Sequence, residues 1–184
     1  MKLQLWHGGR YLESNYRDMI CAKNKWEYGP GLYLTTSYLR AKQYAKGGGN
    51  TYLVDLDLGT EIDKVNIKMD IALSFIDEYI IKSKKKLMLE DIHYHIKRLN
   101  KCDDLNLNVF LNLIINNNAL LKSKTKKLCE FLVNNGADYC YVSNYSGNNE
   151  DVYVIFNRKQ IKSVEKKISQ KIDVNQYELK NNKI

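Results

Sequence analysis

Several features that mark membrane, exported or metal-binding proteins are scarce in this chain. Its 184 residues include one proline, three histidines and four cysteines. A membrane-spanning helix requires roughly 18 or more consecutive apolar residues, and no stretch of the sequence approaches that length. Residues 1–6 are too short and too mixed to form the apolar core of a secretion signal. We therefore expect a cytoplasmic protein that makes no contact with a membrane.

The cysteines argue against a structural zinc site. Cys21, Cys102, Cys129 and Cys140 lie far apart and form no Cys-x-x-Cys pair. A structural zinc ion takes four Cys or His ligands at short characteristic spacings, and the three histidines do not complete such a set. The sequence therefore predicts reduced thiols of the kind found inside cells, and no metal.

Acidic residues are outnumbered by basic ones, 21 against 29, which leaves a net charge of +8. Such an excess favours polyanionic partners. A composition rich in Lys, Asn and Ile would produce the same excess without any selection for nucleic acid. Two lysine clusters, at 82–86 and 122–127, lie beside helical patterns and lack the interleaved aromatic residues of a single-strand groove. We interpret both clusters as solvated helix faces.

The first third of the chain alternates between strand and turn signals. Residues 3–6 alternate weakly and run into His7-Gly8-Gly9, which we interpret as a strand that ends in a sharp turn. A cluster of glycine and proline at 29–31 leads into a strand over 32–35. Ser37 is a suitable N-cap for a short helix over 38–45. Residues 51–58 alternate for eight positions and form the clearest strand pattern of the chain.

The middle of the chain has helical periodicity instead. Apolar residues recur at helical spacing, and we expect helices over 71–81, over 91–96, within 105–121 and over 125–134. Strand patterns return at 138–142 and 152–156. We interpret 61–135 as a helical lobe inserted into one α+β domain, residues 1–162, between two halves of its sheet. Residues 163–184 are expected to form a basic, polar tail.

His7 and two tyrosines are the first candidates for chemistry. A histidine at a strand end can bond a ribose hydroxyl, and an adjacent glycine lets the backbone approach a planar amide. Tyr33 and Tyr44 stand eleven positions apart, one on a strand and one on a helix. Such rings could lie on either side of one flat ligand, each worth ~0.5–1.5 kcal/mol beyond area burial. With 14 tyrosines in the chain, however, one such pair also arises readily by chance.

Glu150 and Asp151, just before the late strand, are the candidate acidic groups. A carboxylate at the start of a strand can stabilise the oxocarbenium-like cation that forms when an N-glycosidic bond breaks. The alternative is an acidic turn before an edge strand, which is common.

Taken in order, these motifs resemble the ADP-ribosyltransferase superfamily, in the branch of poly-ADP-ribose polymerases and diphtheria toxin. That branch is similar in having a His-Gly pair on its first strand, a Gly-x-Gly-x-Tyr strand with a second Tyr eleven residues on, and a late strand opened by a catalytic Glu. Here the first two are His7-Gly8 and Gly29-x-Gly31-x-Tyr33 with Tyr44, and the late strand contains 153–161. The resemblance covers about 1–58 and 136–162, and implies a split mixed β-sheet core into which the helical lobe is inserted.

The third motif departs from the family pattern. Val152 stands where the family has its Glu, directly before Tyr153. Side chains alternate along a strand, so Glu150 shares a face with Val152 while Asp151 points to the other face unless a bulge intervenes. We favour Glu150 as the functional carboxylate, with Asp151 next. The third alternative is that neither acts. Poly-ADP-ribose synthesis is not expected.

The resemblance implies a role for each motif residue, with NAD as co-substrate and no metal. His7 would bond the ribose, and the backbone at Gly8 and Gly9 would hold the nicotinamide carboxamide. Tyr33 and Tyr44 would sandwich the nicotinamide ring, and Glu150 or Asp151 would offset the developing positive charge. The pocket floor would be supported by Thr35, Thr36 and Ser37.

The expected activity is transfer of a single ADP-ribose from NAD to a macromolecular acceptor, a protein rather than a nucleic acid. In the style of a toxin or effector, the chain could also be delivered into a host cytosol, and a cognate inhibitor or antitoxin would then be a further partner. The alternatives are a nucleic-acid-modifying ADP-ribosyltransferase, an NAD glycohydrolase, and an inactive module that binds NAD or protein. The sequence leaves the oligomeric state open.

Overall fold

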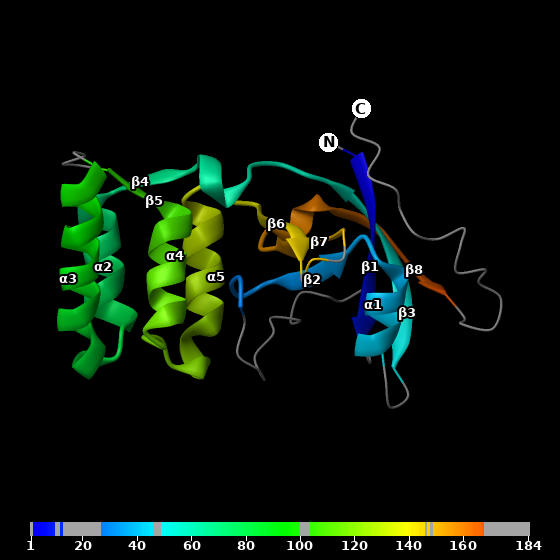
Figure 1. Cartoon of the computed structure of the whole chain (residues 1–184), viewed down its shortest axis with the longest axis horizontal. Coiled ribbons are helices and arrows are strands. Elements are labelled where there is room, and N and C mark those ends of the chain that lie inside the picture. Colours follow the sequence, from blue (N-terminus) through cyan, green and yellow to red (C-terminus); the bar gives the residue numbers. More distant parts are fainter. Residues whose placement is uncertain are drawn as a thin grey trace.

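The computed structural model describes residues 2–9, 12, 27–45, 49–99, 104–145, 147 and 149–167. A six-stranded β-sheet forms one side of the molecule and a bundle of helices forms the other (Figure 1). The chain is thus an α+β protein, as the sequence predicts.

The sheet has the strand order β6-β7-β2-β1-β3-β8. Each of its registered strand pairs is antiparallel, so the mixed sheet expected from the resemblance is wrong. Among the described residues, Glu61 and Tyr139 form a parallel contact, which is an isolated bridge outside the named strands. The strands are β1 (Lys2–Gly9), β2 (Leu32–Thr35), β3 (Asn50–Asp57), β6 (Tyr139–Tyr145), β7 (Glu150–Ile155) and β8 (Ile161–Lys167).

The sheet separates along the line between β1 and β2. β1 pairs with β3 over its full length, but its register with β2 contains the single pair Trp6 and Thr35. Beyond that pair the imidazole of His7 bonds the Tyr33 carbonyl at 2.9 Å. The His7 side chain thus bonds a backbone carbonyl that would otherwise lack a strand partner where β1 and β2 diverge. This division into β6-β7-β2 and β1-β3-β8 positions the candidate site.

The His-Gly-Gly segment is part of β1, and the sharp turn expected there is wrong. Gly8 lies opposite Thr51, and Gly9 lies opposite Asn50, in the β1–β3 ladder. The glycine at position 8 is explained by packing, because a Cβ there would lie 1.7 Å from the Ala41 carbonyl oxygen. Helix α1 (Tyr38–Tyr44) therefore lies directly on the backbone of β1.

The polar tail expected from residue 163 is wrong over residues 163–167. Residues 161–167 form β8, which pairs with β3 at the edge of the sheet. Ile161 is buried and Val164 packs partly against the core, while most other side chains of the strand are exposed. Edge strands often carry lysine, and this composition conceals the strand pattern. Residues 168–184 lie outside the described residues.

The lobe contains four helices and a short two-stranded sheet (Figure 1). Helices near 71–81 and over 125–134 are confirmed, while α3 extends well beyond the expected 91–96 because its exposed, lysine-rich first half conceals the period. The region expected to be helical within 105–121 begins with a strand. The elements of the lobe are β4 (Asn66–Lys68), α2 (Met69–Tyr79), α3 (Lys82–Leu99), β5 (Asp104–Asn106), α4 (Leu107–Asn116) and α5 (Thr125–Asn134), with short 3-10 turns at Ile62–Lys64 and Lys122–Lys124. A further 3-10 turn, Arg158–Gln160, joins β7 to β8.

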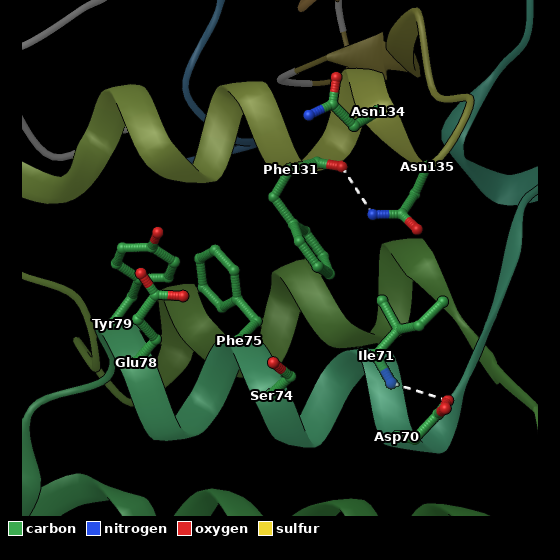
Figure 2. Close-up of a pocket in the computed structure, with 9 residues that line it drawn as sticks. All are labelled: Asp70, Ile71, Ser74, Phe75, Glu78, Tyr79, Phe131, Asn134 and Asn135. Carbon is green, nitrogen blue, oxygen red and sulfur yellow. Dashed lines mark hydrogen bonds between the residues drawn. The ribbon is translucent and has the colours of Figure 1, made fainter.

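Aromatic rings fill the lobe interior and continue toward the sheet. The ring centres of Phe75 and Phe131 lie 4.4 Å apart. Both rings line a groove of about 420 Å³ between α2 and α5 (Figure 2). The same buried cluster includes Val154 and Phe156 of the sheet side, so the core of the lobe continues into the β6–β7 part of the sheet. Buried side chains of β1, β2, β3, β7 and β8 form a second cluster. In the part of the chain that the structure describes, no helix is both long and apolar enough to cross a membrane.

Candidate active site at the split of the sheet

A cavity of about 440 Å³ opens where β1 and β2 separate. Its walls come from the four strands β1, β2, β6 and β7, from helix α1 and from the segment that precedes β2. Most of the residues that the sequence singles out line this one cavity. The lining residues are Trp6, His7, Gly8, Glu27, Tyr28, Tyr33, Leu34, Thr35, Arg40, Ala41, Tyr44, Tyr145, Glu150 and Val152.

His7 enters the cavity as a neutral imidazole of defined tautomer. A carbonyl oxygen only accepts, so the 2.9 Å contact requires Nδ1–H of His7 to donate to the Tyr33 carbonyl. Burial lowers the pKa of His7 below its ordinary value, against a smaller opposing effect of that hydrogen bond. The other ring nitrogen, Nε2, is therefore an acceptor that can take a hydrogen bond from a hydroxyl group.

The Gly-x-Gly-x-Tyr motif builds the wall around Tyr33. The Tyr33 hydroxyl donates to the Gly29 carbonyl at 3.0 Å and accepts from the Tyr28 amide at 3.1 Å. Gly29 has a φ of +113°, which favours glycine. A Cβ at Gly31 would lie 2.7 Å from the Ile155 carbonyl oxygen, so β2 can approach β7 closely there. The motif thus fixes the Tyr33 ring in the cavity wall.

Tyr44 lies at the end of α1 and at the mouth of the cavity. Its side chain is 64% exposed, and it lines the same cavity as Tyr33. Tyr33 and Tyr44, which stand eleven positions apart in the sequence, thus line the same cavity. An exposed aromatic ring at a cavity mouth is available to stack on a flat ligand.

Glu150 is the carboxylate of this cavity. It is the first residue of β7, and only 4% of it is exposed. Thr35 Oγ1 donates to Oε1 at 2.8 Å, and Arg40 Nε donates to Oε2 at 2.9 Å. A buried carboxylate is costly unless its oxygens are bonded and its charge is paired, and both conditions are met here. The structure thus supplies a fixed negative charge at the cavity wall.

Arg40 is the main site residue that the sequence analysis missed. It projects from α1, forms the ion pair with Glu150 and lies 5.7 Å from the centre of the Tyr145 ring. The hydrogen bond to Glu150 raises the pKa of Arg40. Only five of the 29 basic residues are arginines. The rarity of arginine in this lysine-rich chain could have drawn attention to Arg40. The planar, forked guanidinium of arginine suits a buried carboxylate better than the ammonium group of lysine does.

Tyr145 and Glu27 form a further part of the wall that the sequence did not indicate. The Tyr145 hydroxyl donates to Glu27 Oε2 at 3.1 Å. Burial, with this hydrogen bond, raises the pKa of Tyr145 to about 12. Tyr145 follows a register shift in the β6–β7 pairing, so its face could not be read from alternation.

Asp151 lies on the other face of β7, away from the cavity. The Tyr141 hydroxyl donates to Oδ2 at 3.1 Å, and the Asn144 amide donates to Oδ1 at 3.1 Å. The alternation that separated Glu150 from Asp151 in sequence is therefore observed on β7, although the register with β6 shifts opposite these residues. Of the two candidate carboxylates, the structure places only Glu150 in the cavity wall.

Three other expected ligand contacts have structural roles instead. Ser37 caps α1 by accepting from the Arg40 amide at 3.3 Å. Thr36 accepts from the Asp151 amide at 3.0 Å, which ties β2 to β7. Gly9 leaves room for His7, since a Cβ there would lie 2.7 Å from Nε2. None of the three is among the residues that line the cavity.

The described thiols and acidic groups form no second reactive centre. Burial raises the pKa of Cys129 to about 11 and that of Cys140 to about 12, so both are weak nucleophiles. Cys21 and Cys102 lie outside the described residues. Among the residues that are described, no three His, Cys, Asp or Glu side chains are grouped so that they could hold a metal ion.

Comparison of the chain with models of protein families, with curated proteins and with solved structures gave no match. The interpretation of the site therefore rests on its own residues and geometry.

Proposed function

We propose that this protein binds NAD in the cavity between β1 and β2 and transfers one ADP-ribose unit to a macromolecular acceptor in the cytosol. The observation that carries the proposal is that Glu150, buried and ionically paired, lines the same cavity as His7, Tyr33 and Tyr44. The chain segments that bring these side chains together are separated by more than a hundred residues, as in the pair of Arg40 and Glu150.

The residues fit the nicotinamide end of the dinucleotide. Two tyrosine rings suit a flat pyridinium ring. Neutral His7 presents an acceptor, Nε2, to which a ribose hydroxyl can donate. Gly8 needs no ligand to explain it, because α1 occupies the space of its side chain. Its contribution to NAD binding would therefore be limited to its backbone groups.

The chemistry expected of Glu150 is electrostatic. When the bond between ribose C1″ and the pyridinium nitrogen breaks, its electron pair leaves with neutral nicotinamide and the ribose becomes cationic. A fixed carboxylate lowers the energy of that cation. A nucleophilic atom of the acceptor then bonds to C1″ and releases its proton. Arg40 and Thr35 are positioning residues, because they hold both oxygens of Glu150.

Val152 is the point at which the site departs from the family pattern. It lines the cavity where the family carries its glutamate. Glu150 stands two residues earlier on the same face of the strand, a displacement of roughly 7 Å. A catalytic role for Glu150 therefore requires the ribose to bind closer to the start of β7. This displacement supports transfer of a single unit rather than chain synthesis.

An inactive NAD-binding module is the second candidate. It is favoured by one observation, that both carboxylate oxygens of Glu150 already accept hydrogen bonds from Thr35 and Arg40. In that case Arg40 would hold the acid in a structural ion pair rather than present it to a substrate.

Incubation of the protein with a cell lysate and NAD labelled in its adenosine half tests the proposal. We expect label on macromolecules and release of nicotinamide. His7→Ala should lose this turnover while it retains the circular dichroism of the folded protein. Free ADP-ribose alone would instead indicate a glycohydrolase, and NAD binding without turnover would indicate the inactive module. A wild-type rate of nicotinamide release in the His7 variant would contradict the proposed site.

A further inference from the structure

Two lysine clusters that are forty residues apart in sequence meet at one end of the lobe. Ile80 and Leu120 form an antiparallel bridge, and the Ile81 amide donates to the Ala119 carbonyl at 2.9 Å. The cluster at 82–86 follows Ile80 closely in sequence, and the cluster at 122–127 follows Leu120. In Figure 1 this is the lower end of the lobe, where α2 leads into α3 and α4 leads into α5.

Most of these lysines have no acidic partner. Three of them form ion pairs with single carboxylates, Lys85 with Asp77, Lys86 with Glu90 and Lys127 with Glu130. The first turns of α3 and α5 contain no acidic residue. Within the described part of the chain, no carboxylate lies within ion-pair distance of the remaining lysines, which we call the basic face: Lys82, Lys84, Lys122, Lys124 and Lys126.

The bridge therefore changes the interpretation of the two clusters. Taken singly, each was a solvated helix face. Together they place five uncompensated positive charges on adjacent segments that are largely exposed. Repulsion among like charges held together destabilises a fold slightly, and this cost is offset when a polyanion binds.

We propose that the basic face binds the phosphate backbone of a double-stranded nucleic acid. Lysines act on phosphates as point charges, and contacts of this kind carry affinity without reading sequence. A single strand would call for exposed aromatic rings among the cations. Tyr79 lies at this end, but Lys124 Nζ already lies 5.7 Å from the centre of its ring. The arrangement therefore fits a duplex.

The basic face uses none of the residues that line the cavity in the sheet. Nucleic-acid binding by the lobe can therefore be tested independently of NAD turnover in the cavity. If both hold, the lobe brings the protein to a duplex, and the cavity acts on that duplex or on proteins bound to it.

The test is fluorescence anisotropy of the full chain with a labelled DNA duplex, repeated with the RNA duplex and the DNA single strand of the same sequence. The variant carries Lys82→Gln, Lys84→Gln and Lys122→Gln. Its matched control carries Lys68→Gln, Lys97→Gln and Arg98→Gln, the same change in charge at exposed positions of β4 and of the last turn of α3, toward the opposite end of the lobe. Circular dichroism establishes that both triple variants are folded.

We expect the affinity for duplexes to fall steeply as the salt concentration rises. Comparison of the DNA duplex with the RNA duplex shows which of the two the protein binds more tightly. Each phosphate contact adds about 0.9 to the slope of log affinity against log salt on B-form DNA, so the test variant should lose about 2 to 3 in slope and tenfold or more in affinity. The control should lose much less. Equal losses in the two triple variants would overturn the proposal. Stronger binding to the single strand, or binding to anionic lipid vesicles but not to duplexes, would also contradict it.

Discussion

The sheet and the lobe treat buried polar side chains differently. In the described sheet half, four buried polar residues lie where β2 leads into α1 and β7 begins: Thr35, Thr36, Glu150 and Asp151. The fifth, Thr51, lies on β3. In the described part of the lobe, Thr125 is the buried polar residue, and it bonds the Lys122 carbonyl at the start of α5. Burying polar groups is costly unless they are hydrogen-bonded. Of the four clustered residues, Thr35 and Glu150 line the cavity. The comparison places the buried carboxylates in the sheet half, whereas the described interior of the lobe is almost entirely apolar.

The largest expected effect concerns the core that joins the two halves. Phe110 is fully buried in the lobe, and Phe110→Ala should lower the free energy of unfolding by about 3–5 kcal/mol. Lobe and sheet should still unfold together, because one apolar cluster includes residues of both. Circular dichroism follows the helices, and fluorescence follows Trp6 and Trp26, which both lie outside the lobe.

Leu87→Ala, at an exposed position of α3, is the control for this change and should have a small effect. Separate unfolding transitions for the two signals would break the view that the core of the lobe continues into the sheet.

Replacement of the cavity carboxylate comes next. Glu150→Gln should reduce NAD turnover by roughly 10²–10³-fold, the loss expected when a group that stabilises developing charge is removed. Asp151→Asn is the matched control, because Asp151 is the next residue of β7, equally buried, and faces away from the cavity. Nicotinamide release measures both. Equal loss in the two variants would show that fold, and not the charge in the cavity, controls turnover.

The ion pair between Arg40 and Glu150 can be tested through stability. Arg40→Gln leaves a buried carboxylate without its cation, at a cost of about 1–3 kcal/mol because Arg40 is partly exposed. The double variant Arg40→Gln/Glu150→Gln removes both charges and should regain part of that loss. Urea denaturation of the two single variants and the double variant gives the coupling energy. Additive losses would show that the pair contributes nothing.

His7 should make stability depend on pH. Burial lowers its pKa in the folded protein, so the unfolded chain binds the proton more readily. Stability is complete above the ordinary value of 6.5 and declines as pH falls from there toward the lowered pKa, by at most about 1.4 kcal/mol per pH unit. His7→Gln should flatten this part of the pH profile in urea denaturation. His93→Gln, on the exposed face of α3, should leave it unchanged.

The smallest effect is expected at the mouth of the cavity. Tyr44→Ala should weaken NAD binding by about threefold to tenfold, the value of one stacked ring, without loss of stability. Tyr94 on α3 has the same exposed fraction of 64% and serves as the control. Calorimetric titration compares the two variants. Equal affinity in both would remove Tyr44 from the site.

The sequence predicted local structure better than pairing. Alternation located β3, and helical periodicity located α2 and α5, because each depends on neighbouring residues. The start of α3 was missed since its first turns bury few side chains. The directions of the strands were wrong in part, because pairing joins distant segments whose order no local pattern contains.

The candidate site was predicted through its motifs but not through its contacts. The motifs marked His7, Tyr33, Tyr44 and Glu150, all of which line the cavity. Arg40 was missed because its partner is 110 residues away. The packing of α1 against Gly8 was not predicted, since that helix comes from another segment of the chain.

The most direct test of the account is whether nicotinamide enters the cavity of the sheet. Saturation-transfer nuclear magnetic resonance of NAD with the wild-type protein should show contact at the protons of the nicotinamide ring. Tyr33→Phe, which keeps the ring, should retain that signal, and Tyr33→Leu should lose it. Absence of the signal from the wild type, or an equal signal from both variants, would contradict the proposed site.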